Sequence, residues 1–156
     1  MASTIELKKL SSKNIVSPKG FTAAGVHCGI KHKKKDLAIL VSDVPASVAG
    51  VFTTNAVQAA PIKVTKDVVY NTKKMQAVIV NSGNANACTG KQGLADAFEM
   101  QQLAAKKLGI DASLVGVAST GVIGEIMKME PVKAGMALLK PDSKLENGID
   151  FAQAIM

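Results

Sequence analysis

The chain has 156 residues, of which 47% are hydrophobic and 20% charged, the composition of a globular protein of about one domain. Its net charge of +7 comes from lysine without arginine, and only 3% of its residues are aromatic, so it is poorly equipped to read and stack nucleic-acid bases. No run approaches about 18 apolar residues, so no membrane-spanning helix is expected.

The first part of the chain predicts a β-hairpin. Residues 1–20 look irregular and end in a turn signal that contains Pro18 and Gly20. Apolar runs at residues 21–30 and 37–41 flank a charged turn, a pattern typical of a hairpin. The second run is apolar throughout, so we expect it to be buried on both faces.

Three further extended segments are expected before the middle of the chain. Residues 48–53 have the apolar content of a strand, and residues 75–80 indicate a strongly buried one. Residues 61–65 are expected to be extended as well, because Pro61 disfavours the helical conformation at Ala60.

The second half of the chain changes to helical periodicity. Apolar residues recur at spacings of three and four over residues 94–108, which predicts an amphipathic helix that ends at Gly109. A strand is expected at 114–119, a second helix at 131–140 and the N-cap of a last helix at Asp150. Strands followed by helices indicate a layered α/β fold, in which sheets are flanked by helices.

The cysteines and the first residues indicate a cellular compartment. Cys28 and Cys88 are far apart in the chain and show none of the spacings of a metal site. Residues 1–13 have neither the apolar stretch of a secretory leader nor the arginines of a mitochondrial transit peptide. Unpaired thiols without a leader predict a cytoplasmic protein.

A loop rich in asparagine and glycine follows the strand expected at residues 75–80. Loops at strand ends bind ligands in α/β proteins, and the side chains of Asn81, Asn84 and Asn86 could both donate to and accept from an amide or a carboxylate. The same residue types also tolerate left-handed backbone and cap their own turns. The pattern alone leaves both interpretations open, and it identifies no substrate-binding residue.

A second polar turn, Ser119-Thr120-Gly121, also follows an expected buried strand. The hydroxyl of Thr120 and the backbone N–H of Gly121 could converge on one oxygen and stabilise the charge that develops there during acyl transfer. Glycine allows the close approach and the backbone angles that such a turn needs. The alternative interpretation is an ordinary turn between a strand and a helix.

No other residues complete a catalytic set. Cys88 has no histidine placed near it by the sequence, and it fits a buried structural thiol better than a nucleophile. His27 alternates with apolar neighbours, as a half-buried and hydrogen-bonded histidine does, and His32 falls in a lysine-rich turn that we expect to be solvated. The carboxylates are scattered, and Glu125 is the nearest candidate because it follows the second polar turn. The sequence therefore offers an oxyanion-stabilising turn without a nucleophile and without a metal site.

The two polar turns resemble signatures of the ornithine acetyltransferase, or glutamate N-acetyltransferase, family. The matching segments are residues 78–90 and residues 119–124. Shorter segments that resemble the family lie at residues 17–21, 25–29, 59–62 and 151–156. The last of these resembles the run that precedes a Thr-Thr-Asp stretch in the family. The resemblance covers nearly the whole chain in order.

This resemblance implies a fold similar to that of the N-terminal-nucleophile hydrolases with different connectivity, as in DmpA-like self-cleaving proteins. It implies a precursor that cuts itself before a threonine, which becomes the nucleophile at the start of a separate β chain. The enzyme would take acetyl from N2-acetylornithine and pass it to glutamate in arginine biosynthesis by a ping-pong route. In the family, the pair that matches Thr120 and Gly121 forms the oxyanion hole.

The resemblance also implies partners. Residues 1–156 would be a single-domain N-terminal, or α, part of a two-chain enzyme, without the C-terminal tail of that part and inactive alone. Its partners would be the β chain that begins with threonine, N-acetylornithine and glutamate. The two chains would form a heterodimer that assembles into a dimer of such units, a heterotetramer, or into a higher oligomer. No cofactor and no metal is expected, and the use of acetyl-CoA as a second acetyl donor stays open.

Two other functions also stay open. A self-cleaving amidase or aminopeptidase on a similar scaffold would release free acetate without a need for glutamate. A non-catalytic, lysine-rich module that binds an anionic ligand would rest on the net charge of +7 and on the lysines of residues 31–35.

Overall fold

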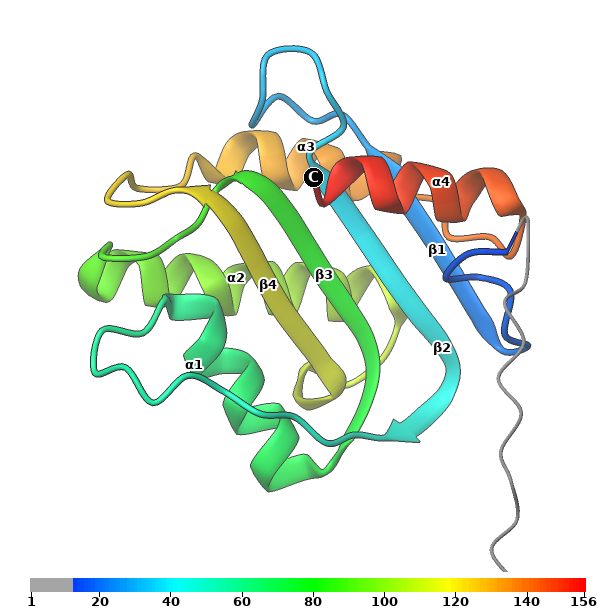
Figure 1. Ribbon diagram of the computed structural model, residues 1–156, viewed down its shortest axis with the longest axis horizontal. Coiled ribbons are helices and arrows are strands. Elements are labelled where there is room, and N and C mark those ends of the chain that lie inside the picture. Colours follow the sequence, from blue (N-terminus) through cyan, green and yellow to red (C-terminus); the bar gives the residue numbers. More distant parts are fainter. Residues whose placement is uncertain (1–12) are drawn as a thin grey trace, which may run out of the picture.

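The computed structural model describes residues 13–156, which form one four-stranded sheet with helices on both faces (Figure 1). The strands, in their order across the sheet, are β1 (Phe21–Val26), β2 (Leu37–Ser47), β3 (Lys74–Asn84) and β4 (Val115–Val122). The layered α/β fold expected from the sequence is therefore confirmed. The sequence predicts an irregular segment at residues 1–20, and residues 1–12 of it lie outside the described residues.

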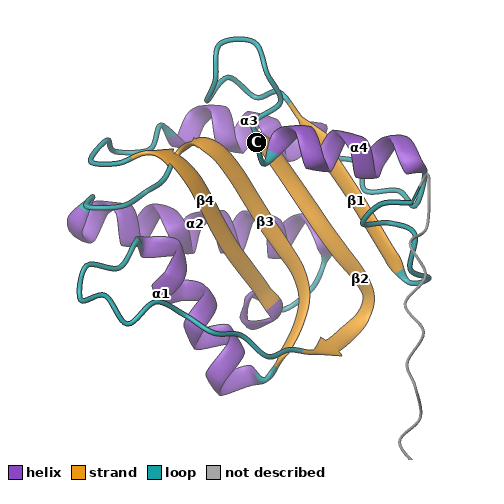
Figure 2. Ribbon diagram, viewed as in Figure 1, coloured by secondary structure: helices purple, strands orange, loops and turns teal. Residues whose placement is uncertain are grey.

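Helices cover the two faces unequally (Figure 2). They are α1 (Ala60–Asp67), α2 (Gly90–Leu108), α3 (Met129–Leu138) and α4 (Leu145–Ala154), with a π-helical turn at Val68–Thr72 and a 3-10 turn at Ala112–Leu114. Helices α2 and α3 pack on one face, α4 packs on the other face over β1 and β2, and α1 lies beside β4 and α2. None of the described helices is both long enough and apolar enough to cross a membrane.

The sheet is mixed, and its one parallel pair determines where the two polar segments lie. Strands β1, β2 and β3 pair antiparallel, whereas β3 and β4 pair parallel. A parallel pair needs a crossover connection, and α2 supplies it. The turns predicted after residues 80 and 119 were wrong, because β3 continues to Asn84 and β4 to Val122. Because parallel strands end at the same edge of a sheet, the two polar segments, which form these strand ends, lie side by side there.

Successive side chains of the strands point alternately into two apolar cores, one on each face of the sheet. In β2, Leu37 and Ile39 point into the larger core with α2 and α3, and Ala38 points into the smaller core under α4. In β3, Ile79 and Val80 divide in the same way. This arrangement confirms that residues 37–41 form a strand that starts buried on both faces, as its unbroken apolar sequence predicts.

The outer edge of β4 is covered by a helix. The hydroxyl of Thr65 in α1 donates to the carbonyl oxygen of Val117 at 2.6 Å and accepts from the backbone N–H of the same residue at 2.8 Å. An edge strand normally leaves such groups open to pairing with another strand. One threonine hydroxyl thus replaces a neighbouring strand at this position.

The prediction of an extended segment at residues 61–65 was wrong, since these residues lie in α1. Pro61 stands in the first helical turn, where its missing N–H costs nothing. The extended residue is Ala59, the N-cap, with ψ of 150°.

Three other predicted elements differ from the structure. Residues 48–53 form no strand, because β2 bends at an irregularity between Val41 and Ala46 and its pairing with β3 ends at Ser47. Strand β1 was expected to reach residue 30, but it ends at Val26, and a compact loop follows it. The last helix begins at Leu145, before Asp150.

Candidate functional site

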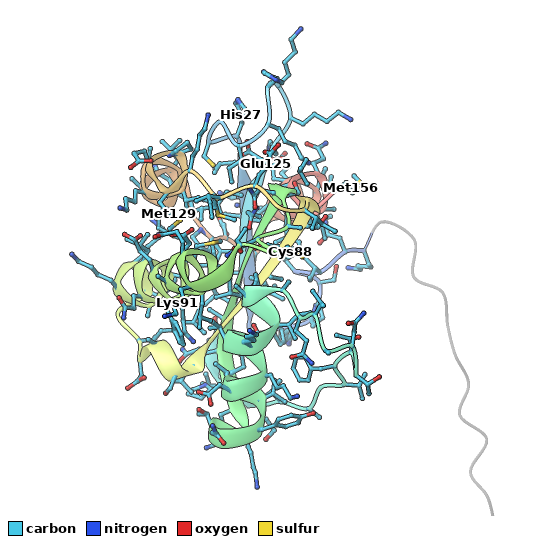
Figure 3. All side chains as sticks on the ribbon, turned by 90° about the vertical axis from the view of Figure 1, so that its left-hand side faces the viewer. His27, Cys88, Lys91, Glu125, Met129 and Met156 are labelled. Carbon is cyan, nitrogen blue, oxygen red and sulfur yellow. The ribbon has the colours of Figure 1, made fainter. Side chains whose placement is uncertain are left out.

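The two polar segments singled out in the sequence lie side by side at the C-terminal ends of β3 and β4, within the strands; the name Thr-Gly turn is kept for Thr120 and Gly121. Ser82 is the register partner of Thr120, and Gly83 is the register partner of Gly121. Figure 3 looks toward this edge, around which separate segments of the chain bring Cys88, Glu125 and Met156. The structure therefore brings the asparagine-rich loop and the Thr-Gly turn together.

Backbone contacts fix the position of the Thr-Gly turn. Gly121 has φ of 132°, and a Cβ there would lie 2.3 Å from the carbonyl carbon of Gly83 and 2.6 Å from the nitrogen of Asn84. Gly83 has φ of 105°, and a Cβ there would lie 2.9 Å from Ile30 and 3.0 Å from Lys31. Glycine is therefore required at both positions. Any other residue would keep these neighbouring segments of the chain further apart.

Thr120 is exposed and lies on the α4 face of the sheet. Two positions earlier on this strand, Ala118 packs against the smaller core under α4, whereas Val117 points to the opposite face. Beside Thr120, the hydroxyl of Ser82 donates to the carbonyl oxygen of Ala154 at 2.5 Å and ties the end of α4 to β3. A hydroxyl in this place can donate a hydrogen bond to an oxygen that approaches the edge from the α4 side.

The three asparagines of the first turn are buried and engaged in the protein itself. The side-chain nitrogen of Asn81 donates to the carbonyl oxygen of Asn84 at 2.9 Å, and that of Asn84 donates to the carbonyl oxygen of Glu125 at 3.0 Å. The side-chain nitrogen of Asn86 donates to the carbonyl oxygen of Gly93 at 2.8 Å. Of the two interpretations left open by the sequence, these contacts favour the structural one.

A buried carboxylate, missed by the sequence reasoning, holds the loop between β1 and β2. Asp36 is fully buried and accepts from the backbone N–H groups of Cys28 at 2.7 Å, Lys31 at 2.8 Å and Gly29 at 3.1 Å. Its oxygen also lies 3.1 Å from Nδ1 of His27. The only sequence signal was an aspartate at the start of a buried strand.

These contacts set the ionisation of two groups in the loop. Burial raises the pKa of Asp36, but the backbone N–H donors outweigh burial and hold this pKa below its ordinary value. Burial, together with the neighbouring Asp36 carboxylate, raises the pKa of Cys28 to about 12. Asp36 is therefore charged and Cys28 is a neutral thiol near neutral pH.

Asp36→Asn is expected to lower the free energy of unfolding by about 2 kcal/mol near neutral pH, because charged hydrogen bonds are lost in a buried site. The pKa of Asp36 is lower in the folded than in the unfolded protein. Its stabilising contribution is thus complete above about pH 4 and is lost as the pH falls through the folded-state pKa. Denaturant unfolding over a pH series should show the difference between variant and parent closing below about pH 4.

Asp43→Asn is the matched control for this series, since Asp43 is an exposed aspartate of β2. We expect its effect to stay within about 0.5 kcal/mol. A difference between Asp36→Asn and the parent protein that does not change with pH would contradict the assignment.

The remaining sequence candidates fall outside the paired turns. The prediction that Cys88 is buried was wrong: it is exposed, in a left-handed turn with φ of 58° that leads to α2 at the surface. Cys88 lines a cavity of 480 Å³ between the starts of α1 and α2. His32 is exposed, as expected, and the half-exposed, hydrogen-bonded state expected for His27 is confirmed, with 42% of its side chain exposed. Within residues 13–156, no three side chains of the metal-binding types converge.

These features define a class of protein, namely an α/β domain that presents a Thr-Gly turn at the C-terminal edge of its parallel strand pair. The ArgJ family matches residues 22–156. The chain belongs to the ArgJ family, which confirms the resemblance drawn from the two polar turns.

Curated relatives carry the name "Arginine biosynthesis bifunctional protein ArgJ". The protein of this name from Staphylococcus epidermidis is 58% identical over 92% of this chain, and the match covers 35% of its own length. The protein from Bacillus thuringiensis subsp. konkukian is 49% identical over 100% of this chain and 38% of its own length. The chain therefore spans little more than a third of the curated relatives that it matches.

Solved structures share the fold. The crystal structure of Arginine biosynthesis bifunctional protein ArgJ from Bacillus halodurans has a TM-score of 0.92 and 49% identity, and the match covers 95% of this chain and 78% of that chain. Ornithine acetyltransferase from Mycobacterium tuberculosis, solved in complex with ornithine, has a TM-score of 0.90 and 40% identity over 94% of this chain and 80% of that chain.

Proposed function

We propose that this chain is the N-terminal, α part of a two-chain glutamate N-acetyltransferase. The whole enzyme transfers acetyl from N2-acetylornithine to glutamate in arginine biosynthesis. Membership of the ArgJ family supports this proposal, and so does the likeness to an ornithine acetyltransferase solved with ornithine. The observation that carries it is the exposed Thr120 directly before Gly121, whose backbone is fixed against Gly83 at the edge of the sheet.

In this proposal, Thr120 and Gly121 donate hydrogen bonds to the carbonyl oxygen of the acetyl group. The hydroxyl of a threonine at the start of the β chain attacks the carbonyl carbon, the amide C–N bond breaks, and ornithine leaves with the proton. The acetyl group then forms an ester on that threonine. The amine of glutamate attacks the ester, forms the new amide and returns the threonine hydroxyl. Both steps place negative charge on the oxygen, which the two donors stabilise.

The lengths of the compared chains support a division into two chains. The chain covers 38% of the B. thuringiensis relative but 78% of the crystallised B. halodurans chain. The crystallised chain is therefore about half as long as the curated relative. A precursor that is cut into two chains would give this difference.

Apolar side chains around the turn support a partner at this edge. Val122, Ile123 and Ile126 are exposed to 50%, 65% and 52%. Large apolar side chains gathered on one part of a surface mark a protein–protein contact. A β chain bound over them would bring its first residue near Thr120, and further pairing of such units would give the heterotetramer.

The proposal includes no metal and no cofactor, and it leaves the use of acetyl-CoA as a second acetyl donor open. It places the enzyme in the cytoplasm, and the two free cysteines, Cys28 and Cys88, fit a reducing compartment. The nucleophile belongs to the β chain in this scheme, so this chain alone should not transfer acetyl.

The test is to express the full-length gene product, measure intact masses, and assay acetylornithine with and without glutamate. We expect two chains, the second beginning with threonine, and acetyl transfer that requires glutamate. Release of free acetate without glutamate would favour the amidase alternative instead. A single uncut chain without acetyl transfer would overturn the proposal.

A further inference from the structure

Two polar side chains beside the Thr-Gly turn have hydrogen-bonding atoms that the described chain leaves without a partner. Asn81 of β3 and Ser119 of β4 are register partners, directly before Ser82 and Thr120. Oδ1 of Asn81 and Oγ of Ser119 are both buried, and neither has a hydrogen-bond partner within residues 13–156. Buried polar atoms without partners are rare in folded proteins, so each one calls for an explanation.

The orientation of the Asn81 amide is determined by its other contact. Its side-chain nitrogen donates to the carbonyl oxygen of Asn84 at 2.9 Å, and a flipped amide would place two oxygens against each other. Oδ1 is therefore the free atom, and it can only accept. What Asn81 needs is a donor, and its side chain is fully buried, so bulk water cannot supply one.

Ser119 is the polar side chain best placed to supply that donor. Side chains of register partners on neighbouring strands share one face, with the strands about 5 Å apart. A serine hydroxyl can donate, and rotation about the single Cα–Cβ bond carries it between staggered positions. We propose that, in the assembled enzyme, the hydroxyl of Ser119 donates to Oδ1 of Asn81 and that this pair positions Thr120 and Gly121 for acetyl transfer.

The location of the pair explains why it would act on the turn. Ser119 immediately precedes Thr120 on β4, and Asn81 lies two residues before Gly83, against which Gly121 packs. A hydrogen bond between the two strands at this point holds them in register directly before the two donors. Misplacement of catalytic groups by about 1 Å can lower turnover by up to about 100-fold.

The catalytic part of this inference rests on the proposed acetyl transfer, and kinetics of Ser119 variants in the full-length protein test it. Ser119→Ala should lower kcat by about tenfold with KM within about twofold, because the donors are displaced while substrate contacts remain. Ser119→Thr keeps the hydroxyl and should restore at least half of the parent kcat. A kcat of Ser119→Ala within about twofold of the parent value would overturn the positioning role.

Thr65→Val is the matched control, since it removes a hydroxyl that is bonded to the same strand at its other edge. It should lower the thermal midpoint and leave kcat unchanged. An equal loss of kcat in Thr65→Val and Ser119→Ala would mean that Ser119 only stabilises β4. This outcome would also overturn the proposal.

Stability measurements test the pair without any reference to activity. In a double-mutant cycle of Ser119→Ala and Asn81→Ala, the shift in thermal midpoint of the double variant should be smaller than the sum of the single shifts. Additive shifts would show that the two side chains are not bonded. If Asn81→Ala does not fold, Asn81→Ser takes its place. A parent enzyme that transfers no acetyl would overturn the proposed function. The double-mutant cycle would still show whether Ser119 and Asn81 are hydrogen-bonded.

Discussion

Thr120→Ala in the full-length protein is expected to lower kcat for acetyl transfer by about 100- to 1,000-fold, with little change in KM for acetylornithine. The hydroxyl of Thr120 would act on a charge that develops only in the transition state, so its loss slows turnover rather than weakening binding. Steady-state kinetics of the variant, on material whose two chains are verified by mass, provides the measurement.

Two variants make this experiment specific. Thr120→Ser keeps a hydroxyl at the same position and should retain most of the activity. Thr54→Ala removes an exposed threonine in the segment before α1 and should behave as the parent enzyme. If Thr120→Ala turned over at the parent rate, Thr120 would have no part in stabilising the oxyanion.

The second large effect is expected from Gly25→Ala, because β1 touches the backbone of α4 at this glycine. A Cβ on Gly25 would lie 2.1 Å from the carbonyl oxygen of Asp150 and 2.8 Å from the nitrogen of Phe151. The helix would have to move away as a unit, which also strains the contact between Ser82 and Ala154. We expect the free energy of unfolding to fall by about 3 kcal/mol, measured by urea or thermal unfolding.

Gly50→Ala provides the comparison for this variant. A Cβ on Gly50 would meet the ring of Phe52 at 3.4 Å and Val69 at 3.6 Å, ordinary contacts with side chains that can adjust. The change in stability should stay within about 0.5 kcal/mol. Similar losses for Gly25→Ala and Gly50→Ala would argue against close packing of α4 on β1.

The elements that sequence patterns predicted well are those with long apolar patterns. The helix expected at residues 94–108 appears as α2, which extends a few residues further at its start and ends at the expected Gly109. The buried strands expected at 37–41 and 75–80 lie inside β2 and β3. In each case many side chains face one core or two, so no single neighbour decides the structure.

Elements whose prediction depended on a single residue, such as a proline or a possible N-cap, were predicted poorly. Pro61 suits both an extended segment and the first turn of a helix, and only the packing of α1 on β4 decides between them. Asp150 has the chemistry of an N-cap, but its carboxylate pairs with Lys35 of the loop between β1 and β2. Asp150 lies inside the last helix, which starts at Leu145 after the N-cap Lys144.

The candidate site could be predicted only in part from the sequence, because some of its contacts join residues that are far apart in the chain. Thr120 and Gly121 are adjacent in the chain, so the turn could be predicted as a unit. The contact of Gly121 with Gly83, and the pairing of Asn81 with Ser119, depend on the register between strands that are far apart in the sequence. No local pattern reports such a register, although glycine inside a strand-end loop is a sign of close backbone approach.

The hydroxyl of Thr65 against β4 has a consequence for how the protein avoids aggregation. Helix α1 precedes β4 in the chain, so its threonine is already made when β4 leaves the ribosome. The threonine hydroxyl occupies the backbone groups of Val117, which a strand of a second copy could otherwise pair with. At the opposite edge, Ala23 and Asp142 exchange a pair of backbone hydrogen bonds that blocks β1 in the same way. At Val117 and at Ala23, strand-edge groups that could pair with a strand of another molecule are therefore already occupied.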